Sequence, residues 1–139
     1  MGTTLNPYLS FRDDAREAMT FYADVFGGDL TVSTFGDYGD PEAPEAALVM
    51  HAQLQTADGL VLMGADTPPG MEHTPGGALT VSLSGDDDEL LTGWWSRLSE
   101  GGQVSVPFEK QMWGDTFGMC TDRFGIPWMV NLAGSGAPA

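Results

Sequence analysis

Hydrophobic and polar residues alternate along several short stretches of the chain, a period of two that is typical of β-strands. Leu79, Val81 and Leu83 alternate with threonine and serine, and residues 30–35 alternate and are rich in threonine and valine. Other short apolar runs end at turn-forming sequences such as the one at 56–59. We therefore predict strands at 6–11, 30–35, 47–55, 60–64, 78–84, 103–108, 117–121 and 126–132.

Two further stretches have a helical period, with apolar residues at spacings of three and four. Asp14, with Glu17 three residues later, has the form of a capping box, and Asp87 or Asp88 is placed to cap the second helix. Glycine pairs at 27–28 and 101–102 end the two patterns. The predicted apolar faces are Ala15, Ala18, Met19, Tyr22, Val25 and Phe26 in the first helix, and Leu91, Trp94, Trp95 and Leu98 in the second.

The order of these elements occurs twice, which indicates a duplicated βαβββ unit. With an offset of 73 the matching pairs are Asp14 and Asp87, Phe21 and Trp94, Tyr22 and Trp95, and Gly28 and Gly101; with an offset of 66 they are Gly59 and Gly125, and Met63 and Met129. We predict an α+β fold of tandem βαβββ modules, with curled mixed sheets and helices on the convex faces. The modules are expected at 1–66 and 78–132, the linker at 67–77 and a disordered tail at 133–139, as one domain overall. Residues 36–45 are predicted to be a loop.

The amino-acid composition of the chain narrows the classes of partner that it can bind. The chain has 139 residues, 20 acidic against 5 basic, and a net charge of -15, which disfavours binding to nucleic acid and to anionic membranes. A single cysteine excludes an internal disulfide, and the apolar neighbours of Cys120 favour a buried, inert thiol. Neither a membrane-spanning run nor a signal peptide is apparent, so a cytoplasmic location is expected.

Four stretches of the sequence resemble one known family. They are NPYLSF at 6–11, AMTFYADVFGG at 18–28, MHA at 50–52 and GMCTDRFGIPWMVN at 118–131. The chain resembles the vicinal oxygen chelate superfamily, the glyoxalase and bleomycin-resistance proteins, and more narrowly its PhnB-like branch. The resemblance implies a glyoxalase-like fold and a homodimer.

The resemblance also implies where a divalent metal would bind. The family's ligand positions fall near Asn6 or Pro7, on or near His51, near Thr80 and on Asn131. One imidazole and one amide make a poor first-row metal site. We therefore expect no cofactor, with a divalent metal at His51 as the alternative. No glycine-rich methyl-donor motif follows a strand, so a methyltransferase is not favoured.

The candidate site residues each have a functional and a structural interpretation. His51 is a candidate metal ligand, general base or hydrogen-bond donor, or else a buried histidine bonded to a neighbour. Asn131 would orient a polar ligand group, or pair with His51. Trp113, Phe117 and Trp128 form either an aromatic box for a flat ligand or ordinary core.

The charges and the aromatic residues together suggest three functions. Glu109 would attract a cationic ligand, or is simply a solvated loop charge. We expect a metal-poor small-molecule-binding protein of the resistance or sequestration type. The first alternative is a metal-dependent enzyme of the glyoxalase or dioxygenase type that uses His51. The second is a non-catalytic structural or regulatory domain with a filled core.

Overall fold

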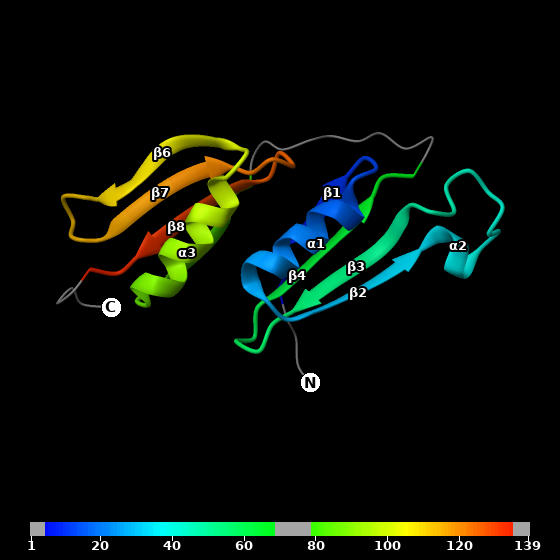
Figure 1. The fold of residues 1–139 in the computed structure, drawn as a ribbon, viewed down its shortest axis with the longest axis horizontal. Helices are drawn as coiled ribbons and strands as arrows, with labels where there is room; N and C mark the ends of the chain where they lie inside the picture. The colour runs from blue at the N-terminus through cyan, green and yellow to red at the C-terminus, as the bar shows by residue number, and fades with distance from the viewer. Residues whose placement is uncertain (1–4, 69–78, 135–139) are drawn as a thin grey trace. The chain divides into compact units, whose positions relative to one another are not determined.

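The computed structural model describes residues 5–68 and 79–134. The chain divides into two compact units, Met1–Pro75 and Gly76–Ala139. Each unit consists of one four-stranded mixed sheet with a helix packed on one face (Figure 1). This confirms the prediction of an α+β fold built from tandem βαβββ modules. Most of the predicted linker, and of the predicted tail, lies outside the described residues.

The first unit has the strand order β1-β4-β3-β2, in which β1 runs parallel to β4 and the other pairs are antiparallel. Its elements are β1 (Tyr8–Phe11), α1 (Ala15–Phe26), β2 (Asp29–Thr34), α2 (Phe35–Tyr38), β3 (Val49–Gln55) and β4 (Val61–Asp66).

The second unit has the same topology, with the order β5-β8-β7-β6 and β5 parallel to β8. Its elements are β5 (Val81–Gly85), α3 (Asp88–Ser99), β6 (Gln103–Lys110), β7 (Thr116–Thr121) and β8 (Pro127–Leu132). Neither this unit nor the first contains, among the described residues, a helix long and apolar enough to cross a membrane.

Alternation along the inner strands gives each sheet two different faces. In β8, Trp128, Val130 and Leu132 are buried, whereas Met129 and Asn131 between them are only half-buried. The buried set lies on the side where α3 packs, and β4 follows the same pattern beneath α1. We call the face turned away from the helix the open face of each sheet. A residue's place in the alternation therefore decides whether it belongs to the core or to the open face.

The hairpin turns and the helix ends repeat, with one shift of register. Gly59 and Gly125 both have φ of 89°, so the predicted turn pair is confirmed. At the helix ends, however, Gly27 (φ 74°) corresponds to Gly101 (φ 79°), and the predicted pairing of Gly28 with Gly101 is wrong by one residue. The reason is one extra residue, Glu100, between α3 and its glycine pair.

The predicted capping box at the start of α1 is wrong. The side chain of Asp14 makes no capping hydrogen bond. Instead Asp66, buried at the end of β4, accepts hydrogen bonds from the backbone N–H groups of Ala15 and Val49, each at 2.9 Å. For α3 the prediction is confirmed, because Asp87 accepts a hydrogen bond from the N–H of Leu90 at 3.1 Å.

The segment predicted as a loop at 36–45 begins with helical structure. It contains most of the short helix α2, followed by a series of turns (Figure 1). The N–H of Phe35 donates to the carbonyl of Leu48 at 3.1 Å, and that of Gly36 to the carbonyl of Ala46 at 3.0 Å. These bonds fold the loop back onto α2.

Candidate functional site

The predicted site residues of the second unit lie largely on its open face. In the antiparallel pairing of β6, β7 and β8, Glu109 is opposite Phe117, and Phe117 is opposite Asn131. Directly opposed residues of antiparallel strands project to the same face. The next pair along the same face is Met119 opposite Met129. A carboxylate, an aromatic ring and an amide therefore lie in one row across the sheet, beside two methionines.

Trp113 joins this row from the turn between β6 and β7. The turn is closed by hydrogen bonds from the N–H of Gln111 to the carbonyl of Asp115 (2.7 Å) and from the N–H of Gly114 to the carbonyl of Gln111 (3.0 Å). The indole of Trp113 is 58% exposed, and its ring centroid lies 6.2 Å from that of Phe117, tilted by 60°. The structure thus brings together two of the three rings predicted to contact a ligand.

Asn131 is held in place by Asp115. Its side-chain Nδ2 donates to Asp115 Oδ2 at 3.0 Å, and the N–H of Gly134 donates to Asp115 Oδ1 at 2.8 Å. These two hydrogen bonds, chiefly that of Asn131, lower the pKa of Asp115 from its ordinary value of 3.8, so the anchor is ionised at neutral pH. With Nδ2 committed, Oδ1 of Asn131 is the atom that can accept a hydrogen bond from a ligand.

Trp128 lies on the other face of the same sheet. Its side chain is only 1% exposed, and its indole N–H donates to Asp122 Oδ2 at 2.8 Å. Asp122 Oδ1 also accepts hydrogen bonds from the N–H groups of Phe124 and Ile126. Trp128 is therefore part of the core beneath α3, away from the row formed by Phe117 and Asn131.

His51 belongs to the first unit, on β3. Its Nδ1 lies 3.0 Å from the hydroxyl of Tyr8 on β1, and the two ring centroids are 5.7 Å apart. His51 is opposite Ser33 of β2. Sequence reasoning missed Tyr8, although its alternation with the buried Leu9 and Phe11 placed it on the face opposite to theirs.

The described residues do not fit a divalent metal. Across 5–68 and 79–134, no three His, Cys, Asp or Glu side chains are arranged to hold an ion. Protein zinc and iron sites use three or four such ligands. His51 has the Tyr8 hydroxyl beside it, and Asn131 is bonded to Asp115. The chain's other histidine, His73, lies outside the described residues.

Cys120 is buried, as predicted, with 2% of its surface exposed. Burial, and to a smaller extent the negative charge of Asp122, raises the pKa of the thiol to about 11. The thiolate is the nucleophilic form of cysteine, so Cys120 is almost entirely unreactive at neutral pH.

Comparison with known proteins identifies a matching family and several similar proteins. A sequence model described as the Glyoxalase/Bleomycin resistance protein/Dioxygenase superfamily matches residues 4–130. Protein YjdN of Escherichia coli is 27% identical over 141 residues, covering 92% of this chain and 94% of YjdN. An uncharacterized protein of Mycobacterium tuberculosis is 30% identical over 133 residues, covering 91% of this chain and 72% of its own length.

Two solved structures resemble this one along nearly the whole chain. A protein from Pseudomonas aeruginosa has a TM-score of 0.86 and 33% identity, covering 96% of this chain and 100% of its own. A PhnB protein from Bacillus cereus, described as a putative 3-demethylubiquinone-9 3-methyltransferase, has a TM-score of 0.74 and 23% identity, covering 94% and 100%. Because the identity to the PhnB protein is only 23%, that similarity concerns the fold alone.

Proposed function

The chain belongs to the glyoxalase/bleomycin resistance protein/dioxygenase superfamily, and on this premise we propose that it is a small-molecule-binding protein of the resistance or sequestration type that works without a metal. One observation carries the proposal: the Trp113–Phe117 ring pair lies on the open face beside Asn131, which Asp115 holds in place. Rings next to a fixed polar group are the usual make-up of a small-molecule site.

The row of side chains favours a flat ligand that is apolar or cationic. Trp113 and Phe117 offer ring surface, and the thioethers of Met119 and Met129 lie beside them, where their flexibility suits irregular ligands. A cation would be attracted by Glu109 and by the ring faces. Asn131 Oδ1 would accept a hydrogen bond from the ligand and fix its orientation.

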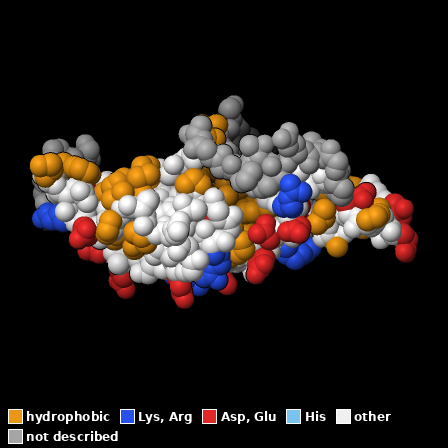
Figure 2. All heavy atoms as spheres, turned by 90° about the horizontal axis from the view of Figure 1, so that it is seen from above, with side chains coloured by type: hydrophobic (Ala, Val, Ile, Leu, Met, Phe, Trp, Pro, Cys, Tyr) orange, Lys and Arg blue, Asp and Glu red, His pale blue; other side chains and the backbone are white. Residues whose placement is uncertain are grey.

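We also propose that the protein is a cytoplasmic homodimer. This rests on the family to which the chain belongs. Figure 2 shows acidic side chains at several separate places on the face seen there, rather than in one block. That distribution, with a net charge of -15, favours neither nucleic acid nor anionic lipid as a partner.

The test is a calorimetric titration with proflavine, a planar cation, and with metal-free bleomycin, a larger cation that carries a flat bithiazole group. Trp113→Ala and Phe117→Ala are each expected to weaken binding about tenfold, because a buried aromatic contact contributes on the order of 1.4 kcal/mol. Met112→Ala is the matched control, since Met112 is the neighbouring residue of the same turn and is 98% exposed. Equal affinity in all variants, or no binding by the wild-type protein, would reject this site.

One observation favours the alternative of a metal-dependent enzyme. The Tyr8 hydroxyl at Nδ1 of His51 fixes the orientation of the imidazole, as a partner of a metal-binding or proton-transferring histidine does. Elemental analysis of the purified protein decides between the two. Stoichiometric Ni, Zn, Mn or Fe that is lost in His51→Ala would favour the enzyme over the binding protein. With neither metal nor ligand, the non-catalytic domain is the better description.

A further inference from the structure

We propose that the first unit carries a separate pocket for a small organic ammonium cation, formed by α2, the turns that follow it and β3. The pocket has a volume of about 240 Å³. Its lining includes Phe35, Tyr38, Asp40, Glu45, Ala46 and Met50. This pocket is independent of the proposed ligand site, whose residues all belong to the second unit.

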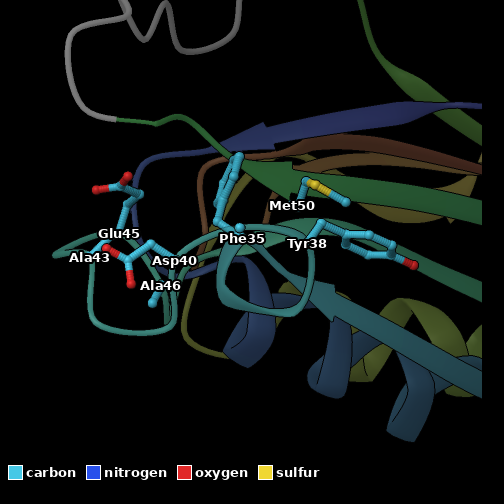
Figure 3. A pocket seen from close by; sticks show the side chains of 8 residues that line it. Phe35, Tyr38, Asp40, Ala43, Glu45, Ala46 and Met50 are labelled. Carbon is cyan, nitrogen blue, oxygen red and sulfur yellow. The ribbon is translucent and has the colours of Figure 1, made fainter.

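A β-bulge directs one wall of the pocket. The pairing of β2 with β3 shifts register between Ser33, which is opposite His51, and Thr34, which is opposite Val49. Met50 is the extra residue on β3. A bulge re-aims the side chain of its extra residue. Figure 3 shows Met50 beside Phe35, so that a thioether and a ring form one part of the lining.

Hydrogen bonds within α2 and the turns after it hold the opposite wall. Asp37 Oδ2 accepts from the N–H of Thr34 at 2.9 Å, which caps α2. The loop is bonded to α2 through Gly36 and Ala46, and a side chain at Gly36 would meet Ala46 at 3.0 Å. Asp40 Oδ1 accepts from the N–H of Glu42 at 2.9 Å, which orients its carboxylate. The pocket is therefore formed by hydrogen-bonded turns.

The chemistry of the lining selects a cation with alkyl groups. Phe35 and Tyr38 supply two aromatic rings, and Asp40 and Glu45 supply two carboxylates, while the lining contains no lysine or arginine. In Figure 3 the carboxylates of Asp40 and Glu45 lie at one end of the pocket and Phe35 lies in the middle, while Met50 and Tyr38 lie at the other end, with the Tyr38 ring directed away from the carboxylates. Figure 2 shows acidic and hydrophobic side chains together at this end of the first unit. Aromatic faces attract a quaternary ammonium group, and nearby carboxylates add to that attraction.

The experiment compares choline with its uncharged isostere, 3,3-dimethyl-1-butanol, by NMR titration of the full-length protein. Choline is expected to shift backbone amide signals in residues 35–50 and to bind about three- to thirty-fold more tightly than the isostere. Equal binding of choline and the isostere, or no shifts in residues 35–50 at saturating choline, would overturn the proposal.

Variants locate the effect in the pocket. The double change Asp40→Asn and Glu45→Gln keeps the Oδ1 acceptor for Glu42 and is expected to remove the preference for choline over the isostere. Tyr38→Ala is expected to weaken choline binding, and the exposed side chain of Tyr38 makes loss of the fold no concern. Glu42→Gln, an acid of the same loop that does not line the pocket, is the matched control and should bind choline like the wild type. An equal loss in the control would show that only the overall charge matters and would overturn the proposal. Trp113→Ala, by contrast, should leave choline binding unchanged, whatever it does to the binding of proflavine and bleomycin.

Discussion

At the scale of single residues, two buried carboxylates organise one unit each. Asp66 is 5% exposed and Asp122 is 3% exposed. Asp66 joins the end of β4 to the starts of α1 and β3, and Asp122 closes the β7–β8 turn and bonds the indole of Trp128. Among the described residues, no buried side-chain N or O atom lacks a hydrogen-bond partner. These acids are stabilising because they satisfy backbone donors that would otherwise be buried unpaired.

Replacing Asp66 tests this role. Asp66→Asn is expected to lower the free energy of unfolding by about 2–3 kcal/mol, because an amide can accept from only one of the two N–H groups and turns an N–H toward the other. Asp14→Asn is the control and is expected to change it by less than about 0.5 kcal/mol, since the Asp14 carboxylate makes no cap bond. Urea unfolding followed by circular dichroism measures both. Asp14→Ala, which leaves no acceptor for a cap, is expected to change the free energy of unfolding equally little, and a loss of about 1 kcal/mol or more in it would restore the predicted capping box.

At the scale of elements, the two helices have equal lengths but use different faces. Both have 12 residues and start 73 positions apart, at Ala15 and Asp88. In α1 the second residue of the aromatic pair, Tyr22, is fully buried. In α3 the first residue, Trp94, is the more buried, and Trp95 stacks on Phe108 of β6 at 5.3 Å. The duplicated units therefore keep their topology while the helix–sheet contact differs.

The packing of Trp95 on Phe108 leaves no room for a side chain at Gly118 of β7. A Cβ atom on Gly118 would lie 2.8 Å from the Cα of Phe108 and 2.9 Å from the ring of Trp95. Gly118→Ala is expected to destabilise the protein by about 1–3 kcal/mol, since the tightly packed ring and strand must move apart. Gly93→Ala, within α3, meets nothing within 4 Å and should stabilise by up to about 1 kcal/mol through helix propensity. Thermal unfolding measures both, and an unchanged midpoint in Gly118→Ala would contradict the close packing.

At the scale of the whole molecule, the net charge of -15 opposes self-association. Two copies of an acidic chain repel each other, and salt screens that repulsion over about 10 Å at 0.1 M. We therefore expect the proposed homodimer to be more populated at 0.5 M than at 0.05 M sodium chloride. Size-exclusion chromatography with light scattering at micromolar concentrations measures this. A monomer at both salt concentrations would contradict the proposal of a dimer.

The order of elements, the internal repeat and the buried thiol of Cys120 were all predictable from the sequence. They follow from local patterns: periods of two and of three to four, and turn glycines such as Gly59 and Gly125 whose φ of 89° suits no other residue well. The alternation also implied that Trp128 and Asn131, three residues apart in β8, project to opposite faces. It did not say which face the helix covers, and so which of them belongs to a ligand site.

Tertiary structure decided the rest. The partner that caps α1 is Asp66, 51 residues further along the chain, and no local pattern identifies a partner so distant. Likewise the anchoring of Asn131 by Asp115, the Tyr8–His51 contact and the bulge that turns Met50 into a pocket depend on strand register. Local sequence sets the backbone conformation of a segment, because neighbouring residues restrict each other's dihedral angles. Which side chains meet is set by packing between segments, because burial and hydrogen bonding act across space and not along the chain.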